Sequence, residues 1–137
     1  MKTILVCYEE RPVAQRVLAR AAELAKALDA HVIVTSVAPA LHVVRAGGPV
    51  DPVDPPARHE EEVAQAAKTL AELGLTSVDT VIGLGDVSDT IVALAEEREA
   101  DLIVLGAHDG GVISRLLGTS TTDAVAHKAP TDVLIVH

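Results

Sequence analysis

The 137-residue chain carries a formal net charge of −9, and 49% of its residues are hydrophobic. This composition excludes a disordered chain, and the length predicts one domain, residues 1–137, with a buried core. The negative charge disfavours nucleic acid as a partner, and Tyr8, the only aromatic residue, offers no stacking platform for bases. No apolar run approaches the roughly 18 residues of a membrane-spanning helix, and the first apolar run is too short for a signal peptide. We therefore expect a cytoplasmic protein that does not enter a membrane.

Residues 2–8 form the first predicted strand, because the apolar centre Ile4–Val6 is typical of a strand buried on both faces. Cys7, the only cysteine, excludes an intramolecular disulfide and fits a reducing compartment. We expect it to act as a small hydrophobic residue, with a reactive thiol as the alternative. Hydrophobic residues then recur at helical spacing over 13–28, and Pro12 suits the first turn of that helix.

The middle and end of the chain continue this alternation of strands and helices. Residues 31–37 are rich in β-branched side chains, which favours a second strand. Proline and glycine dominate residues 45–57, so we expect a long loop, either a lid or partner surface or a variable surface excursion. The other predicted elements are a helix over 57–73 ended by Gly74, a strand over 80–84, a helix over 87–99 capped by Asp86 or Ser88, a strand over 102–105, a helix over 119–127 and a strand over 133–136.

Strands that alternate with helices predict an α/β fold, with a single doubly wound, Rossmann-like parallel sheet of five strands and helices on both faces. In such sheets ligands bind beyond the carboxyl ends of the strands. The segment Tyr8-Glu9-Glu10 follows the first strand, and a glycine-bearing segment follows the strand over 102–105. The two segments lie at the same edge of the sheet if these strands are neighbours.

The segment after residue 105 has the composition of a phosphate-binding loop. Gly106, Gly110 and Gly111 allow backbone N–H groups to approach an anion closely, and four hydroxyl residues, Thr119–Thr122, precede a helix. The N-terminus of a helix favours an anion. The alternative is an ordinary helix start, in which Ser120 is followed three residues later by an acid, as in a variant capping box.

Several segments, spread over essentially the whole chain, resemble the universal stress protein family. They are Ile4–Val6 with the helix after it, Gly85-Asp86, Ala100–His108, Arg115–Thr119 and Ala129–Val136. The resemblance implies the same α/β fold and a function in the response to stress. It also implies a homodimer that pairs the apolar terminal strand, Val133–Val136, with its copy, since such a strand at a sheet edge invites pairing.

Nucleotide-binding members of the family hold phosphates with the motif Gly-x2-Gly-x9-Gly followed by Ser or Thr. Gly106, Gly118 and Thr119 match it, but Asp109 takes the place of the second glycine, and the spacing is one residue short. Glu9 stands where a ribose-binding Asp is expected. The resemblance thus implies a site for ATP or another adenine nucleotide, made of Tyr8, Glu9, Val37, Gly106, His108, Asp109, Gly110, Gly118, Thr119 and Ser120.

Asp109 opposes phosphate binding unless Mg²⁺ intervenes or Gly110 takes its place. At about 4 Å and an effective dielectric near 20, two like charges repel by roughly 4 kcal/mol. The alternative function is therefore a homodimeric interaction protein whose pocket binds no nucleotide.

A nucleotide-hydrolysing enzyme is the third hypothesis. It has the least support, because the sequence holds no P-loop, no G-x-S-x-G and no clear general base, so no catalytic residue is assigned. The six histidines match no zinc spacing. Most of them, His59 among them, are expected to be solvated or at helix ends, whereas His108 lies inside the glycine-bearing segment.

Overall fold

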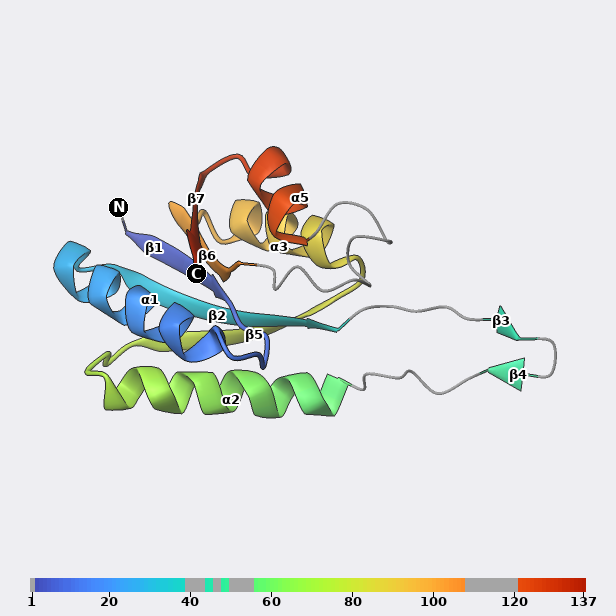
Figure 1. The fold of residues 1–137 in the computed structure, drawn as a ribbon, viewed down its shortest axis with the longest axis horizontal. Coiled ribbons are helices and arrows are strands. Elements are labelled where there is room, and N and C mark those ends of the chain that lie inside the picture. Colours follow the sequence, from blue (N-terminus) through green and yellow to red (C-terminus); the bar gives the residue numbers. More distant parts are fainter. Residues whose placement is uncertain (1, 39–43, 46–47, 50–55, 108–120) are drawn as a thin grey trace.

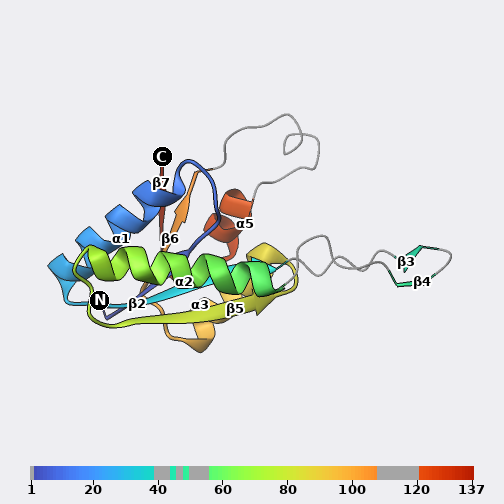
Figure 2. The ribbon, with the colours of Figure 1, turned by 90° about the horizontal axis from the view of Figure 1, so that it is seen from below.

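The computed structural model of the protein describes residues 2–38, 44–45, 48–49, 56–107 and 121–137. Its main sheet has five strands in the order β5-β2-β1-β6-β7, and each neighbouring pair is parallel. The strands are β1 (Thr3–Cys7), β2 (His31–Ala38), β5 (Val78–Leu84), β6 (Leu102–Gly106) and β7 (Asp132–Val136). The helices of the described chain are α1 (Ala14–Leu28), α2 (Pro56–Glu72), α3 (Val87–Glu97) and α5 (Thr121–Lys128). Helices α1 and α2 cover one face of the sheet, and α3 and α5 cover the other (Figures 1 and 2). The predicted doubly wound α/β fold is confirmed.

Three details differ from the sequence-based predictions. Strands β3 (Val44–Arg45) and β4 (Gly48–Pro49) pair antiparallel in a stretch predicted as a loop. Two residues per strand are too few to produce a detectable periodicity, so this pairing was not foreseen. Pro12 lies in the turn before α1 rather than in its first turn, because the residue that precedes the helix is Val13. Gly106 is the last residue of β6, one residue beyond the predicted strand over 102–105.

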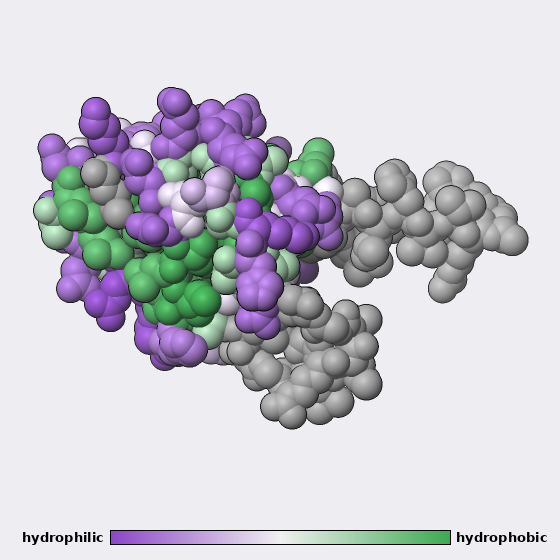
Figure 3. All heavy atoms as spheres, turned by 90° about the horizontal axis from the view of Figure 1, so that it is seen from above, coloured by the Kyte–Doolittle hydropathy of each residue, from purple (hydrophilic) through white to green (hydrophobic). Residues whose placement is uncertain are grey.

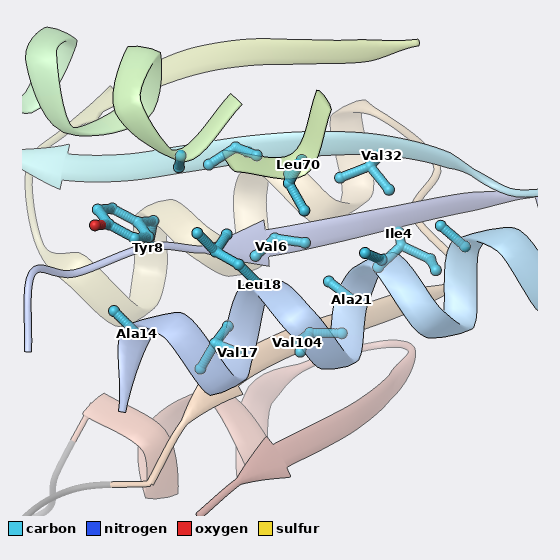
Figure 4. Packing of buried hydrophobic residues seen from close by; sticks show 14 of the residues in the cluster. Ile4, Val6, Tyr8, Ala14, Val17, Leu18, Ala21, Val32, Leu70 and Val104 are labelled. Carbon is cyan, nitrogen blue, oxygen red and sulfur yellow. The ribbon is translucent and has the colours of Figure 1, made fainter. Parts of the chain in front are cut away.

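The core consists of two apolar layers, one on each face of the sheet. Successive residues of a strand point to opposite faces. In β1, Ile4 and Val6 accordingly pack with Leu18 of α1 and Leu70 of α2, as Figure 4 shows. Leu5 belongs to the other layer, which α3 and α5 complete. These side chains are fully buried, and each contributes roughly 1.5–3 kcal/mol by leaving water.

Strand β1 lies in the middle of the sheet, between β2 and β6. The strands that precede the two candidate segments are therefore neighbours, which was the condition for these segments to lie at the same edge of the sheet. The backbone N–H of Tyr8, one residue past β1, donates to the carbonyl of Thr35 at 2.8 Å and so fixes the start of the turn into α1. Within the described residues no helix is long and apolar enough to span a membrane.

Candidate functional site

A cavity of about 260 Å³ opens at the carboxyl ends of β1, β2 and β6. This is the edge at which doubly wound sheets bind their ligands. Its walls come from both faces of the sheet, since α1 and α2 contribute on one side and α3 and α5 on the other. The lining combines apolar side chains with hydroxyl groups and charges of both signs.

Four of the residues predicted for the site line this cavity. Tyr8 and Glu9 follow β1, Val37 belongs to β2, and Gly106 ends β6. The parallel register thus brings together residues far apart in sequence. The other six predicted site residues lie outside the described residues: His108, Asp109, Gly110, Gly118, Thr119 and Ser120.

Gly106 lies close to the start of α1. A Cβ atom added there would lie 2.6 Å from Cγ1 of Val13 and 3.3 Å from Cγ2 of Val17. The carbonyl of Gly106 accepts a hydrogen bond from the buried hydroxyl of Thr122 at 3.0 Å, which ties α5 to the end of β6. The first turn of α5 and the end of β6 therefore form one wall of the cavity.

The phenol of Tyr8 remains protonated well above neutral pH. Burial raises its pKa, and the nearby carboxylates of Glu10 and Glu62 raise it further. Figure 4 shows its ring packed in the core, with the hydroxyl oxygen pointing away from Leu18. Tyr8 therefore offers the cavity an apolar ring and a neutral hydroxyl that can donate a hydrogen bond.

Cys7 also lines the cavity, and burial raises the pKa of its thiol to about 12. It packs against the layer formed by Leu5 and Ile103, as expected of a small hydrophobic residue. Because the thiolate is the reactive form, a thiol reagent at pH 8 is expected to modify the native protein more than about a thousandfold more slowly than the unfolded chain. Reaction with a chromogenic disulfide, with and without denaturant, measures this ratio. Equal rates would contradict the assignment.

A buried polar cluster, formed by Ser36, His59 and Glu62, makes up another part of the wall. These residues are 3%, 6% and 9% exposed. His59 lies in the first turn of α2, at a helix end as one of the two predicted alternatives had it, but it is not solvated. The Ser36 hydroxyl donates to Oε2 of Glu62 at 2.9 Å and lies 2.5 Å from Nδ1 of His59. With its single proton given to the carboxylate, this hydroxyl accepts from the imidazole, which places a proton on Nδ1 of His59.

The sequence contains polar residues that indicate this cluster, but a search for hydrophobic periodicity does not detect them. Thr35 and Ser36 are adjacent hydroxyl residues in a strand that is otherwise apolar at its centre. His59 and Glu62 are three residues apart on a helix and therefore share one face. Helix α2 packs directly on β2, and this contact buries the polar residues of both.

Two arginines bring positive charge to the lining. Nε of Arg58 lies 3.5 Å from Oε1 of Glu62. Nε of Arg11 lies 3.3 Å from Oε2 of Glu9, whose side chain is 73% exposed, against 21% for Arg11. Glu9, placed by the resemblance at a ribose, thus stands at the mouth of the cavity beside a cation.

Comparisons with known proteins agree with this geometry. The sequence model of the universal stress protein family matches residues 1–137. The chain is 33% identical over 141 residues to "Universal stress protein A homolog 1" of Coxiella burnetii, and the match covers 98% of this chain and 95% of that protein. It is 31% identical over 86 residues to "Universal stress protein G" of Salmonella typhimurium, with 58% of this chain and 60% of that protein covered.

A solved structure of a universal stress protein in complex with cAMP is similar over 99% of this chain and 96% of that chain, with a TM-score of 0.75 and 28% sequence identity. Sequence and fold therefore agree along the whole length, and the chain belongs to the universal stress protein family.

Proposed function

We propose that this protein is a cytoplasmic stress-response regulator, one domain over residues 1–137, that binds an adenine nucleotide in the cavity at the ends of β1, β2 and β6. One observation carries the proposal. Tyr8, Glu9, Val37 and Gly106, named from the sequence as site residues, lie in or directly after three strands and line a single cavity. The similarity to a family member solved with cAMP supports an adenine nucleotide as the ligand.

Each wall of the cavity suits a different part of a nucleotide. Tyr8 and Val37 offer apolar surface for a base, and the Glu9 carboxylate offers acceptors for ribose hydroxyls. Gly106 leads into the glycine-bearing segment, where His108, Gly110, Gly118, Thr119 and Ser120 would surround the phosphates. Mg²⁺ would accompany ATP there, because it screens Asp109 from the phosphate oxygens.

Calorimetric titration of AMP and of ATP, with and without Mg²⁺, tests this proposal. We expect micromolar binding that Thr119→Val weakens, because a phosphate donor is lost. Asp109→Gly should strengthen ATP binding by about tenfold or more in the absence of Mg²⁺, because a repelling charge is removed. The matched control is Asp29→Gly, since Asp29 lies outside the cavity lining and has a left-handed φ of 51° that glycine tolerates.

A negative result in this titration would contradict nucleotide binding. If neither nucleotide releases heat or raises the melting temperature, and if the denatured protein releases no nucleotide, the protein does not bind adenine nucleotides. It would then be an interaction protein, the alternative that Asp109 and the shortened segment favour.

We also propose a homodimer formed through β7. This strand ends the sheet next to β6, and Val133, Leu134 and Ile135 remain partly exposed. Figure 3 views the molecule from the side of α5 and β7 and shows hydrophobic surface gathered on that face. An exposed apolar edge strand is a ready template for pairing with a second copy.

Light scattering coupled to gel filtration measures the dimer. The wild-type mass should be twice that of the chain, and Ile135→Lys should shift it toward the monomer by placing a charge at the paired edge. Thr80→Lys, on the opposite edge strand β5, should leave the dimer intact. A monomeric wild type would remove this part of the proposal.

A further inference from the structure

The Arg11 side chain has an N–H donor that no acceptor in the described part of the chain satisfies. Its side chain lines the cavity together with Gly106 and Thr121. Nε is buried, and within the described residues it finds an ion partner in Glu9 but no hydrogen-bond acceptor. A guanidinium carries five N–H donors, and a buried donor without an acceptor lowers stability. Such a group is suited to an anion that enters the cavity.

The start of α1 adds to the positive potential beside Arg11. Val13, which precedes this helix, supplies no side-chain cap, and the first turn contains no acidic residue. The N–H of Ala14 donates to the carbonyl of Arg11 at 2.9 Å, and the first turn forms the positive end of the helix dipole. Val13 and Ala14, at this end of α1, line the same cavity. Arg11 and the helix terminus act on the same space.

A second side chain indicates that the cavity receives a polar ligand. Thr35 is fully buried and lines the cavity, yet its hydroxyl has no hydrogen-bond partner in the described chain. Buried hydroxyls are paired in the large majority of native structures. A ligand that fills the cavity would supply the missing partner. The Thr35 hydroxyl and Nε of Arg11 thus point to one occupant that offers both a polar partner.

The sequence explains why this chain needs such a cation. Asp109 replaces a glycine in the segment that would hold the phosphates, and the net charge of the chain is −9. A phosphate therefore requires a positive charge from elsewhere. Arg58, the other arginine of the lining, lies 3.5 Å from the buried carboxylate of Glu62, whereas Glu9, the ion partner of Arg11 among the described residues, is largely in solvent.

We propose that Arg11 is the residue that binds the ligand's phosphate group, from the β1–α1 turn and beside the positive end of the α1 dipole. This inference rests on the proposed function, because it assumes an adenine nucleotide in the same cavity. In this proposal the preference of the site for a negatively charged ligand comes from a residue outside the glycine-bearing segment. The ligand class that follows is a nucleotide rather than a nucleoside.

Titration of adenosine and AMP into three proteins tests the inference. In the wild type, AMP should bind about tenfold or more tightly than adenosine, the contribution expected of a charged hydrogen bond. Arg11→Gln should bring the AMP affinity down to that of adenosine. Arg20→Gln removes the same charge from the exposed surface of α1, where Arg20 pairs with Glu23, and should keep the preference for AMP.

Salt provides an independent readout, because screening weakens the phosphate contact and not the contacts of the base. The AMP affinity should fall with added salt in the wild type and much less in Arg11→Gln. If Arg11→Gln melts below the temperature of the titration, Arg11→Lys replaces it. Lysine keeps the charge but loses the planar fork, so part of the preference should remain.

The outcomes separate the two proposals. Equal affinities of adenosine and AMP in the wild type, or an AMP preference that survives in Arg11→Gln, would overturn the role of Arg11 and leave an adenine site in place. Binding of neither ligand would overturn the proposed function, and the inference with it.

Discussion

Replacing Ser36 with alanine is expected to lower the free energy of unfolding by about 2–4 kcal/mol. The Ser36 hydroxyl is the centre of the buried cluster, since it hydrogen-bonds to both Glu62 and His59. Without it, a carboxylate that is 9% exposed loses a hydrogen-bond donor, and the imidazole loses its acceptor. Breaking a buried charged network in this way costs more than removing the network as a whole, because a desolvated charge remains.

Denaturant unfolding of a double-mutant set measures this effect. Glu62→Leu removes the charge but leaves Ser36 and His59 able to bond to each other, so it should destabilise less than Ser36→Ala. Adding Glu62→Leu to Ser36→Ala should restore part of the lost stability. Ser77→Ala, which changes an exposed hydroxyl bonded to His31, is the matched control and should cost less than about 0.5 kcal/mol. A loss below about 1 kcal/mol in Ser36→Ala would show that cavity water replaces the hydroxyl.

The second large effect is expected for Gly106→Ala, which should cost about 1–3 kcal/mol and also weaken nucleotide binding. The added Cβ would lie 2.6 Å from Cγ1 of Val13. Val13 is buried and β-branched, so its side chain has little freedom to move, and α1 must shift instead. Because Val13 and Val17 line the cavity, this shift changes the shape of the site.

Removal of the clashing methyl groups tests the explanation. Val13→Ala leaves room for the new Cβ, so the double variant Gly106→Ala, Val13→Ala should be more stable than the sum of the two single effects by about 0.5 kcal/mol or more. Unfolding measurements give the coupling, and AMP titration of the same proteins shows whether affinity recovers. Strictly additive effects would mean that Gly106 matters for a reason other than its contact with α1.

Most of the fold could be predicted from the sequence, because the signals that set it are local. The apolar centre of β1, the helical spacing in α1 and the glycine after α2 each depend on neighbouring residues only. Gly74 adopts a φ of 99°, the left-handed conformation expected of a glycine that ends a helix. The hairpin of β3 and β4 was missed because its strands are too short to carry a period.

The site was predictable only in part. Tyr8, Glu9, Val37 and Gly106 were named because the carboxyl ends of parallel strands meet at one edge and because motifs of the family fall on these positions. Arg11 was not named, since nothing in the local sequence distinguishes it from a surface residue. The cluster of Ser36, His59 and Glu62 was missed because the hydroxyls of β2 and the polar face of α2 meet only when the helix packs on the strand.

The sequence by itself determined the alternation of strands and helices, the apolar core positions and the family, since periodicity and motifs are properties of neighbouring residues. Tertiary structure decided which polar residues share a buried space. Helix α2 packs on β2 and brings His59 and Glu62 against Ser36. The turn after β1 carries Arg11 into the same cavity as Gly106. Desolvation and charge pairing arise only when distant segments meet, so the chemistry of this site was fixed by packing and not by local pattern.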